Sequence, residues 1–172
     1  MTEKPRYRIN YDEIPEINVK PKDPGNNAPF VVRMVHGSDT SIMFADRGPG
    51  YHTKPHYHDA EQMNYVVSGE IWFFVDGHGY RAAKGDIMRI PRNKIHWAWN
   101  RGNEHCVLFE SHTPPLIGDD NLRDKVVALL GPDDDRAAIH GIKNLREPYD
   151  QAEVDAIEAR AIAEEDQRRR KL

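Results

Sequence analysis

Short apolar runs separated by turn residues dominate the middle of the chain. Runs of this length, bounded by Gly, Asn or Asp, are typical of antiparallel β-sheets. Asp76-Gly77 stands between two such runs, which is the usual pattern of a tight β-hairpin. The runs that predict strands are residues 31–36, 41–45, 63–67, 70–75, 78–83, 87–90, 94–99 and 105–112. This pattern predicts an all-β fold, a small antiparallel barrel or jelly roll.

The two ends of the chain follow different patterns. Residues 1–29 contain five prolines, so no long helix can form there. This segment is either a flexible tail or an ordered arm that lies along the barrel or along a partner subunit. We favour a partly ordered arm, because it has apolar residues to bury, which are Tyr7, Ile9, Tyr11, Ile14 and Ile17. Residues 121–130 and 152–171 have helical spacing. The predicted organisation is therefore an arm (1–29), a barrel (30–115) and an extension of C-terminal α-helices (116–172).

Composition excludes several classes of function. The net charge is -4 and the pI is about 6.1, which argues against binding to nucleic acid. The N-terminus has no apolar signal region, and no apolar run reaches membrane-spanning length. Cys106 is the single cysteine and has no partner for an internal disulfide. We therefore expect a cytoplasmic protein with no membrane partner.

The segment 50–69 holds the densest group of possible metal ligands. His56, His58 and Gln62 all have even numbers, so they share one face of an extended strand. Glu61 points to the opposite face unless a one-residue bulge intervenes. His96, in the run 94–99, offers a further ligand from a neighbouring strand. This pattern predicts a metal site on the inner wall of the barrel.

Two spaced motifs in this region resemble those of the cupin family. The first family motif is matched by Gly50, His56, His58 and Gly69, with Gln62 at the position where the family usually has Glu. The second is matched by Gly85, Pro91, His96 and Asn100, with Asn93 in place of the inner Gly. The resemblance covers about residues 40–112. It implies a double-stranded β-helix that holds one divalent metal ion (Zn, Fe, Mn, Ni or Co) on His56, His58, Gln62 and His96.

The exchange of Glu for Gln at position 62 changes the predicted chemistry. Three neutral imidazoles and a neutral amide leave a divalent ion with its full charge. That charge favours an anionic substrate oxygen and disfavours a ferric state. We therefore expect a metal-dependent enzyme of the lyase, isomerase or cyclase type that acts on a small organic acid. A non-haem iron dioxygenase of an aromatic or diketone compound and a non-catalytic small-molecule-binding cupin are the alternatives.

Residues for proton transfer and substrate binding are less sharply defined. The leading candidates for proton transfer are Tyr51, His52 and His105, drawn from a wider pool that also includes Tyr57, Tyr65, His78 and His112. Arg33 is a candidate for binding a carboxylate, because a guanidinium matches carboxylate geometry. Trp72 and Phe74 have even numbers and are expected to form an aromatic wall, which favours a cyclic or aromatic acid. The family and the apolar residues of the arm also suggest a homodimer.

Overall fold

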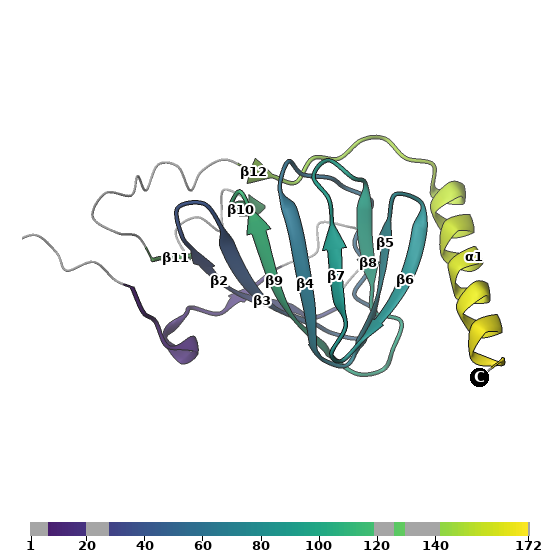
Figure 1. Ribbon diagram of the computed structural model, residues 1–172, viewed down its shortest axis with the longest axis horizontal. Coiled ribbons are helices and arrows are strands. Elements are labelled where there is room, and N and C mark those ends of the chain that lie inside the picture. Colours follow the sequence, from purple (N-terminus) through teal and green to yellow (C-terminus); the bar gives the residue numbers. More distant parts are fainter. Residues whose placement is uncertain (1–6, 20–27, 119–125, 130–141, 172) are drawn as a thin grey trace, which may run out of the picture.

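The computed structural model describes residues 7–19, 28–118, 126–129 and 142–171. Within them lie the short 3-10 helix η1 (Tyr11–Glu13) and the α-helix α1 (Gln151–Arg169). The strands are β1 (Ile17–Asn18), β2 (Phe30–His36), β3 (Ser41–Arg47), β4 (Glu61–Ser68), β5 (Glu70–Val75), β6 (His78–Ala83), β7 (Ile87–Ile90), β8 (His96–Trp99), β9 (Cys106–Thr113), β10 (Leu116–Gly118), β11 (Val127–Ala128) and β12 (Ile142–Lys143). The all-β jelly-roll prediction is confirmed (Figure 1).

Two sheets form the barrel. The larger sheet has the strand order β1-β2-β3-β9-β4-β7, with β11 paired to β2, and the smaller one has the order β6-β5-β8. Side chains alternate between the barrel interior and the outer face along the strands of the larger sheet. On β9, for example, Leu108, Glu110 and His112 are buried, while Phe109 and Ser111 between them are partly exposed. The larger sheet therefore supplies one wall of polar and apolar interior groups.

Within the smaller sheet, β5 is buried on both faces, and α1 packs on the outer face beside β6 (Figure 1). Phe73 points into the barrel core, whereas Trp72 and Phe74 pack with Trp97 and the helix residue Ala161. The helix begins at an Asp150 cap whose side chain accepts from the Ala152 N–H, and it ends among basic residues, as expected for its dipole. The predicted helix over 152–171 is thus confirmed, and it covers the strand that carries His96.

The second predicted helix, over 121–130, is wrong where the structure describes it. Residues 121–125 and 130 lie outside the described residues. Val127 and Ala128 form β11, which pairs in parallel with Val35 and His36 of β2. Pairing with β2 stabilises an extended strand here, although the local spacing of apolar residues favours a helix. Across the described part of the chain, no helix is both long and apolar enough to cross a membrane.

The described part of the arm packs along β2. Ile14 and Ile17 are buried, and β1 pairs antiparallel with β2 through Ile17 and Val32. Tyr7 stays exposed, and Tyr11 makes an edge-on contact with Phe44 on the outer face. Ile17 and Tyr11 of the arm therefore contact this chain's own sheet.

Candidate metal centre

His56 and His96 are joined by a pair of reciprocal backbone hydrogen bonds. The His56 N–H donates to the His96 carbonyl at 3.1 Å, and the His96 N–H donates to the His56 carbonyl at 2.8 Å. This bridge brings the two rings to a centroid distance of 4.3 Å. The His58 ring lies 4.8 Å from that of His96 and 6.3 Å from that of His56. His56 and His58 precede β4, so a bridged loop, and not a continuous strand, brings them together.

A left-handed turn supports this loop from the other motif. Asn93, at the position where the family pattern has Gly, adopts φ 59°. Its N–H donates to the His58 carbonyl at 2.9 Å. Asn tolerates this backbone region better than most residues other than Gly, so the exchange preserves the turn. The turn therefore connects the segment before β8 directly to His58.

All three rings are oriented by their own backbone. His56 Nδ1 lies 2.9 Å from the Lys54 carbonyl, His58 Nδ1 lies 2.9 Å from the Ala60 carbonyl, and His96 Nδ1 lies 2.8 Å from the Lys94 carbonyl. A carbonyl can only accept, so Nδ1 carries the proton and Nε2 keeps its lone pair. Burial lowers the pKa of His56 to about 4 and also lowers the pKa of His58 and His96. The rings are therefore neutral near pH 7, in the tautomer that binds metals through Nε2.

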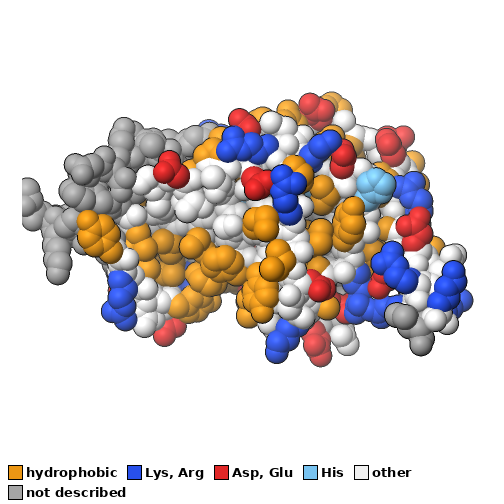
Figure 2. Space-filling model, in the orientation of Figure 1, with side chains coloured by type: hydrophobic (Ala, Val, Ile, Leu, Met, Phe, Trp, Pro, Cys, Tyr) orange, Lys and Arg blue, Asp and Glu red, His pale blue; other side chains and the backbone are white. Residues whose placement is uncertain are grey.

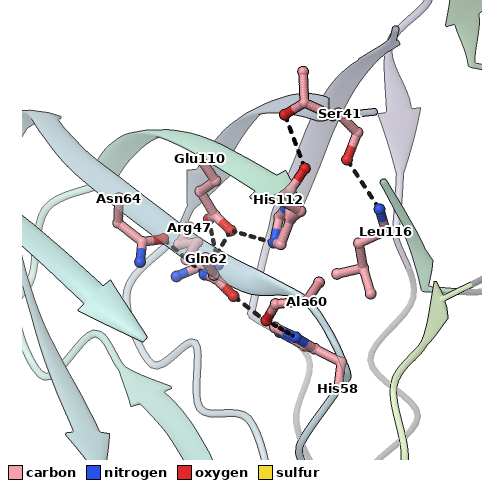
Figure 3. A network of polar contacts seen from close by, with 10 residues as sticks. Ser41, Arg47, His58, Ala60, Gln62, Asn64, Glu110, His112 and Leu116 are labelled. Carbon is pink, nitrogen blue, oxygen red and sulfur yellow. Dashed lines mark hydrogen bonds and ion pairs between the residues drawn. The ribbon is translucent and has the colours of Figure 1, made fainter. Parts of the chain in front are cut away.

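Gln62, the first inward residue of β4, presents its amide oxygen to this cluster. Gln62 is 5% exposed, and its Oε1 lies 3.2 Å from His58 Nε2 (Figure 3). Its Nε2 donates to Asn64 Oδ1 at 2.7 Å and to Glu110 Oε2 at 3.1 Å. Glu61, the alternative ligand, instead pairs with Arg89 on the outer face. Gln62 therefore faces the barrel interior without a bulge.

The contact between Gln62 and His58 places two acceptors face to face. The Gln62 oxygen can only accept, and His58 Nε2 also accepts once Nδ1 donates to Ala60. Lone pairs 3.2 Å apart repel unless a cation lies between them. Two ligands of one ion, each about 2.1 Å from it and roughly at right angles, stand about 3 Å apart. The donor set at this position therefore fits a divalent cation.

The ring spacings agree with the same geometry. Nitrogen ligands about 2.1 Å from an ion put rings on neighbouring positions roughly 4–5 Å apart and rings on opposite positions roughly 6 Å apart. The three observed separations of 4.3, 4.8 and 6.3 Å fall in these ranges. Within the described residues, however, no group of three or more His, Cys, Asp and Glu side chains meets the requirements of a complete metal site. A bound ion would draw the three imidazoles together, with the Gln62 oxygen as an additional ligand.

A buried ion pair lies behind Gln62 and was not predicted. Arg47 Nη2 donates to Glu110 Oε1 at 2.5 Å, and both side chains are almost fully buried. Burial raises the pKa of the Glu110 carboxyl, and the guanidinium of Arg47 opposes this shift. Arg47 also stacks on Tyr51 with its guanidinium carbon 4.9 Å from the ring centroid. The signal in the sequence was one acid and one base at inward positions of two strands.

His112 and His36 extend the polar interior beyond the cluster. His112 lies opposite Gln62 in the register of β4 and β9, and its ring is 5.7 Å from that of His58. Burial lowers the pKa of His112 to about 3. His36 is fully buried on β2, and neither of its ring nitrogens has a hydrogen-bond partner. His112 belonged only to the wider pool of candidates, and the structure brings it next to the centre.

The three leading candidates for proton transfer, Tyr51, His52 and His105, make other contacts. His52 stacks on Trp99, and its Nε2 contacts the carboxylate of Glu158 on α1 at 2.8 Å. His105 is exposed and pairs with Asp46. Tyr51 is buried in the barrel core against Phe30 and Arg47. These contacts place His52 on the outer face beneath α1, His105 at a surface turn and Tyr51 in the barrel core.

The predicted substrate contacts also need correction. Arg33 donates to the Ile14 carbonyl at 2.6 Å and pairs with Glu16, so it anchors the arm on the outer face. Trp72 and Phe74 pack beneath α1 and do not line the interior. Because β5 is buried on both faces, its sequence shows no alternation that distinguishes the inward side. Next to the cluster the neighbours by register are aliphatic, Ile90 opposite Gln62 and Val75 opposite His96.

Comparisons with known proteins agree on the fold. Residues 43–112 match the family described as the cupin domain. The chain is similar to an RmlC-like cupin from Shewanella frigidimarina, with 20% identity over 62% of this chain and 88% of that chain, at a TM-score of 0.50. It is also similar to a protein designated a sugar phosphate isomerase from Acidithiobacillus ferrooxidans, with 20% identity over 63% and 75% of the two chains and a TM-score of 0.51.

A third similar structure is KdgF from Halomonas sp., with 22% identity over 59% of this chain and 88% of that chain, at a TM-score of 0.47. A comparison with curated proteins found no match. At these identities the likeness is one of fold, and it carries no information about substrate.

Proposed function

We propose that this chain, whose residues 43–112 match the cupin domain family, binds one divalent first-row metal ion on His56, His58, His96 and Gln62. The observation that carries the proposal is the 3.2 Å approach of two acceptors, His58 Nε2 and Gln62 Oε1. A cation is the simplest partner for both lone pairs, because burial disfavours a second proton on His58. The Nδ1 contacts to backbone carbonyls support it, since they orient all three Nε2 atoms as ligands.

We further propose Lewis-acid chemistry of the lyase, isomerase or cyclase type on a small organic acid. When bound, the ion would supply a positive charge that polarises a substrate oxygen. His56, His58, His96 and Gln62 would leave that charge unreduced, because all four are neutral. His56 is the most accessible of the three histidines, so substrate would approach on its side. Trp72 and Phe74, the basis for expecting a cyclic or aromatic acid, lie on the outer face, so they do not support a ring in the substrate.

Two assays, one of turnover and one of oxygen consumption, test this chemistry. Metal-free protein is loaded in turn with Zn²⁺, Mn²⁺ and Fe²⁺ and incubated with a panel of small hydroxy, keto and unsaturated acids, with turnover followed by proton NMR. The proposal expects turnover without oxygen consumption. Oxygen uptake with Fe²⁺ in an oxygen electrode would favour the dioxygenase alternative. Binding without turnover of any acid in the panel would favour the non-catalytic small-molecule carrier.

We also propose that the chain forms a homodimer through the outer face of the larger sheet. Strand register aligns a row of side chains across this face, namely Arg33, Phe44, Phe109, Tyr65 and Ile87. Tyr65 is 44% exposed and Ile87 is 65% exposed, and apolar side chains gather here in Figure 2. An ion pair lies near each end of the row, Arg33–Glu16 at β2 and Arg89–Glu61 at β7. A two-fold related copy would therefore cover the apolar centre and set opposite charges against each other.

The proposed location is the cytoplasm. Cys106 is a free, fully buried cysteine, and burial raises the pKa of its thiol to about 11. A chain that has no disulfide among its described residues is compatible with a reducing compartment.

A further inference from the structure

We propose that Glu110 is a positioning residue that keeps the oxygen of the Gln62 amide, and not its nitrogen, turned toward the histidines. This inference rests on the proposed metal site, because it concerns the ligand that Gln62 would provide. It assigns a role to the buried network of Glu110, Asn64 and Arg47 on the side of Gln62 away from the cluster (Figure 3).

A carboxamide can point either of its ends at the cluster, and the two ends have opposite effects. With the oxygen inward, Gln62 offers a metal ligand. With the nitrogen inward, Gln62 would donate a hydrogen bond to His58 Nε2, and the pair would be satisfied without any ion. A free amide would adopt the second arrangement in the absence of metal. The protein must therefore contain a group that opposes the flip.

Asn64 alone cannot provide that opposition. Its Oδ1 accepts from Gln62 Nε2 at 2.7 Å, but its own amide can rotate and offer Nδ2 to a flipped Gln62. Nδ2 of Asn64 has no hydrogen-bond partner in the structure, so rotation would break no other bond made by that nitrogen. Asn64 can thus adapt to either orientation of Gln62.

Glu110 cannot adapt in this way. As a carboxylate it only accepts, and its Oε2 receives the Gln62 N–H at 3.1 Å. A flipped amide would set the Gln62 oxygen against that carboxylate oxygen in a buried site, where the repulsion is poorly screened. Arg47 holds the other oxygen at 2.5 Å and so fixes the position of the carboxylate. The orientation of Gln62 is therefore set by a residue 48 positions away in the sequence.

The test is a double-mutant cycle with Co²⁺ as the probe. Metal-free wild type, Glu110→Gln, Gln62→Leu and the double variant are titrated with Co²⁺ against a competing chelator, and the visible absorption of the bound ion is recorded. Gln at position 110 can donate as well as accept, so it permits the flip. We expect Glu110→Gln to lower the Co²⁺ affinity about 10- to 100-fold in the wild-type background, the usual effect of losing a partner of a metal ligand. In the Gln62→Leu background it should change the affinity less than about two-fold.

The remaining outcomes separate the positioning role of Glu110 from the proposed metal site itself. An equal loss of affinity in both backgrounds, or no loss in either, overturns the positioning role and leaves the metal site intact. Absence of saturable Co²⁺ binding by the wild type overturns both. If Glu110→Gln does not fold because Arg47 loses its partner, Glu110→Asp replaces it in the same cycle, since the shorter carboxylate keeps a negative charge for Arg47 but withdraws from the Gln62 N–H. There we expect a loss of affinity that again vanishes in the Gln62→Leu background, and equal losses in both backgrounds contradict the positioning role.

Discussion

His56 and His96 exchange both of their backbone hydrogen bonds, although they lie 40 residues apart in the two halves of the barrel. The bridge sets the distance between their rings without help from an ion. We therefore predict that metal-free protein keeps this bridge, and that the His56 and His96 amides exchange slowly with solvent deuterium before any metal is added. Hydrogen exchange followed by NMR checks this. Fast exchange of these amides that becomes slow only after metal addition would show that the ion, not the backbone, builds the site.

Gly69 occupies a position that only glycine fits. It adopts φ +74°, and a Cβ there would stand 2.3 Å from the His105 carbonyl oxygen. Gly77 has a similar φ of +78° but open space around it. We predict that Gly77→Ala lowers the free energy of unfolding by about 1–2 kcal/mol, the cost of the left-handed backbone. Gly69→Ala should lower it by clearly more, because backbone must also move. Equal losses in chemical denaturation would contradict the predicted clash.

Acid should destabilise the metal-free protein through its buried histidines. Burial lowers the pKa of His36 from its ordinary 6.5 to about 4. Between these values the unfolded chain binds a proton that the folded chain does not, so stability is complete above pH 6.5 and falls as the pH drops toward 4. A shift of this size corresponds to about 3 kcal/mol for this one residue.

The matching variant is His36→Leu. It removes the imidazole that the unfolded chain would protonate, so the unfolding free energy should decrease less steeply between pH 6.5 and 4. Little stability should be lost at pH 7, because neither ring nitrogen has a hydrogen-bond partner. Met34→Leu, a change without a titrating group at a buried site on the same strand, is the control. A slope in His36→Leu as steep as in the control would contradict the assignment.

The proposed dimer makes its own prediction. Tyr65→Glu places a carboxylate from each copy in the centre of the row, where the interface would bury it. We therefore expect the molecular mass in solution to fall from that of a dimer to that of a monomer. Tyr80→Glu introduces the same change at a comparably exposed tyrosine on β6, outside the row, and should leave the mass unchanged. Light scattering at matched concentrations measures both. A monomeric wild type, or a dimer that survives Tyr65→Glu, contradicts the proposed interface.

The sequence was most informative where chemistry is local. The spacing of His56, His58 and Gln62 within one short segment predicted that all three would face the interior, and the structure brings them together with His96. The period of two in the larger sheet and the Asp76-Gly77 turn, with both residues at positive φ, also predicted the hairpin that is observed. Metal ligation itself stays a prediction.

The sequence was least informative where a contact depends on the register of two strands or on which element packs over a sheet. Trp72 and Phe74 were misplaced because α1 buries the face of β5 that an uncovered sheet would expose. Glu110 and Arg47 lie 63 positions apart, and their pairing depends on the β3–β9 register and on the reach of a long side chain. Arg33 was misplaced for a related reason, because the arm segment whose Ile14 carbonyl it binds is distant in the sequence and is brought to β2 by tertiary contacts. Neither kind of contact is visible in a local pattern.

Elemental analysis of protein purified without added metal tests the central claim most directly. Wild type should contain about one divalent first-row ion per chain. The double variant His56→Ala/His58→Ala should contain none, while His105→Ala, which alters an exposed histidine paired with Asp46, should keep the ion. Circular dichroism of all three proteins controls for folding. One ion per chain retained by the folded double variant would contradict the account, because the proposed ligands would then not hold it.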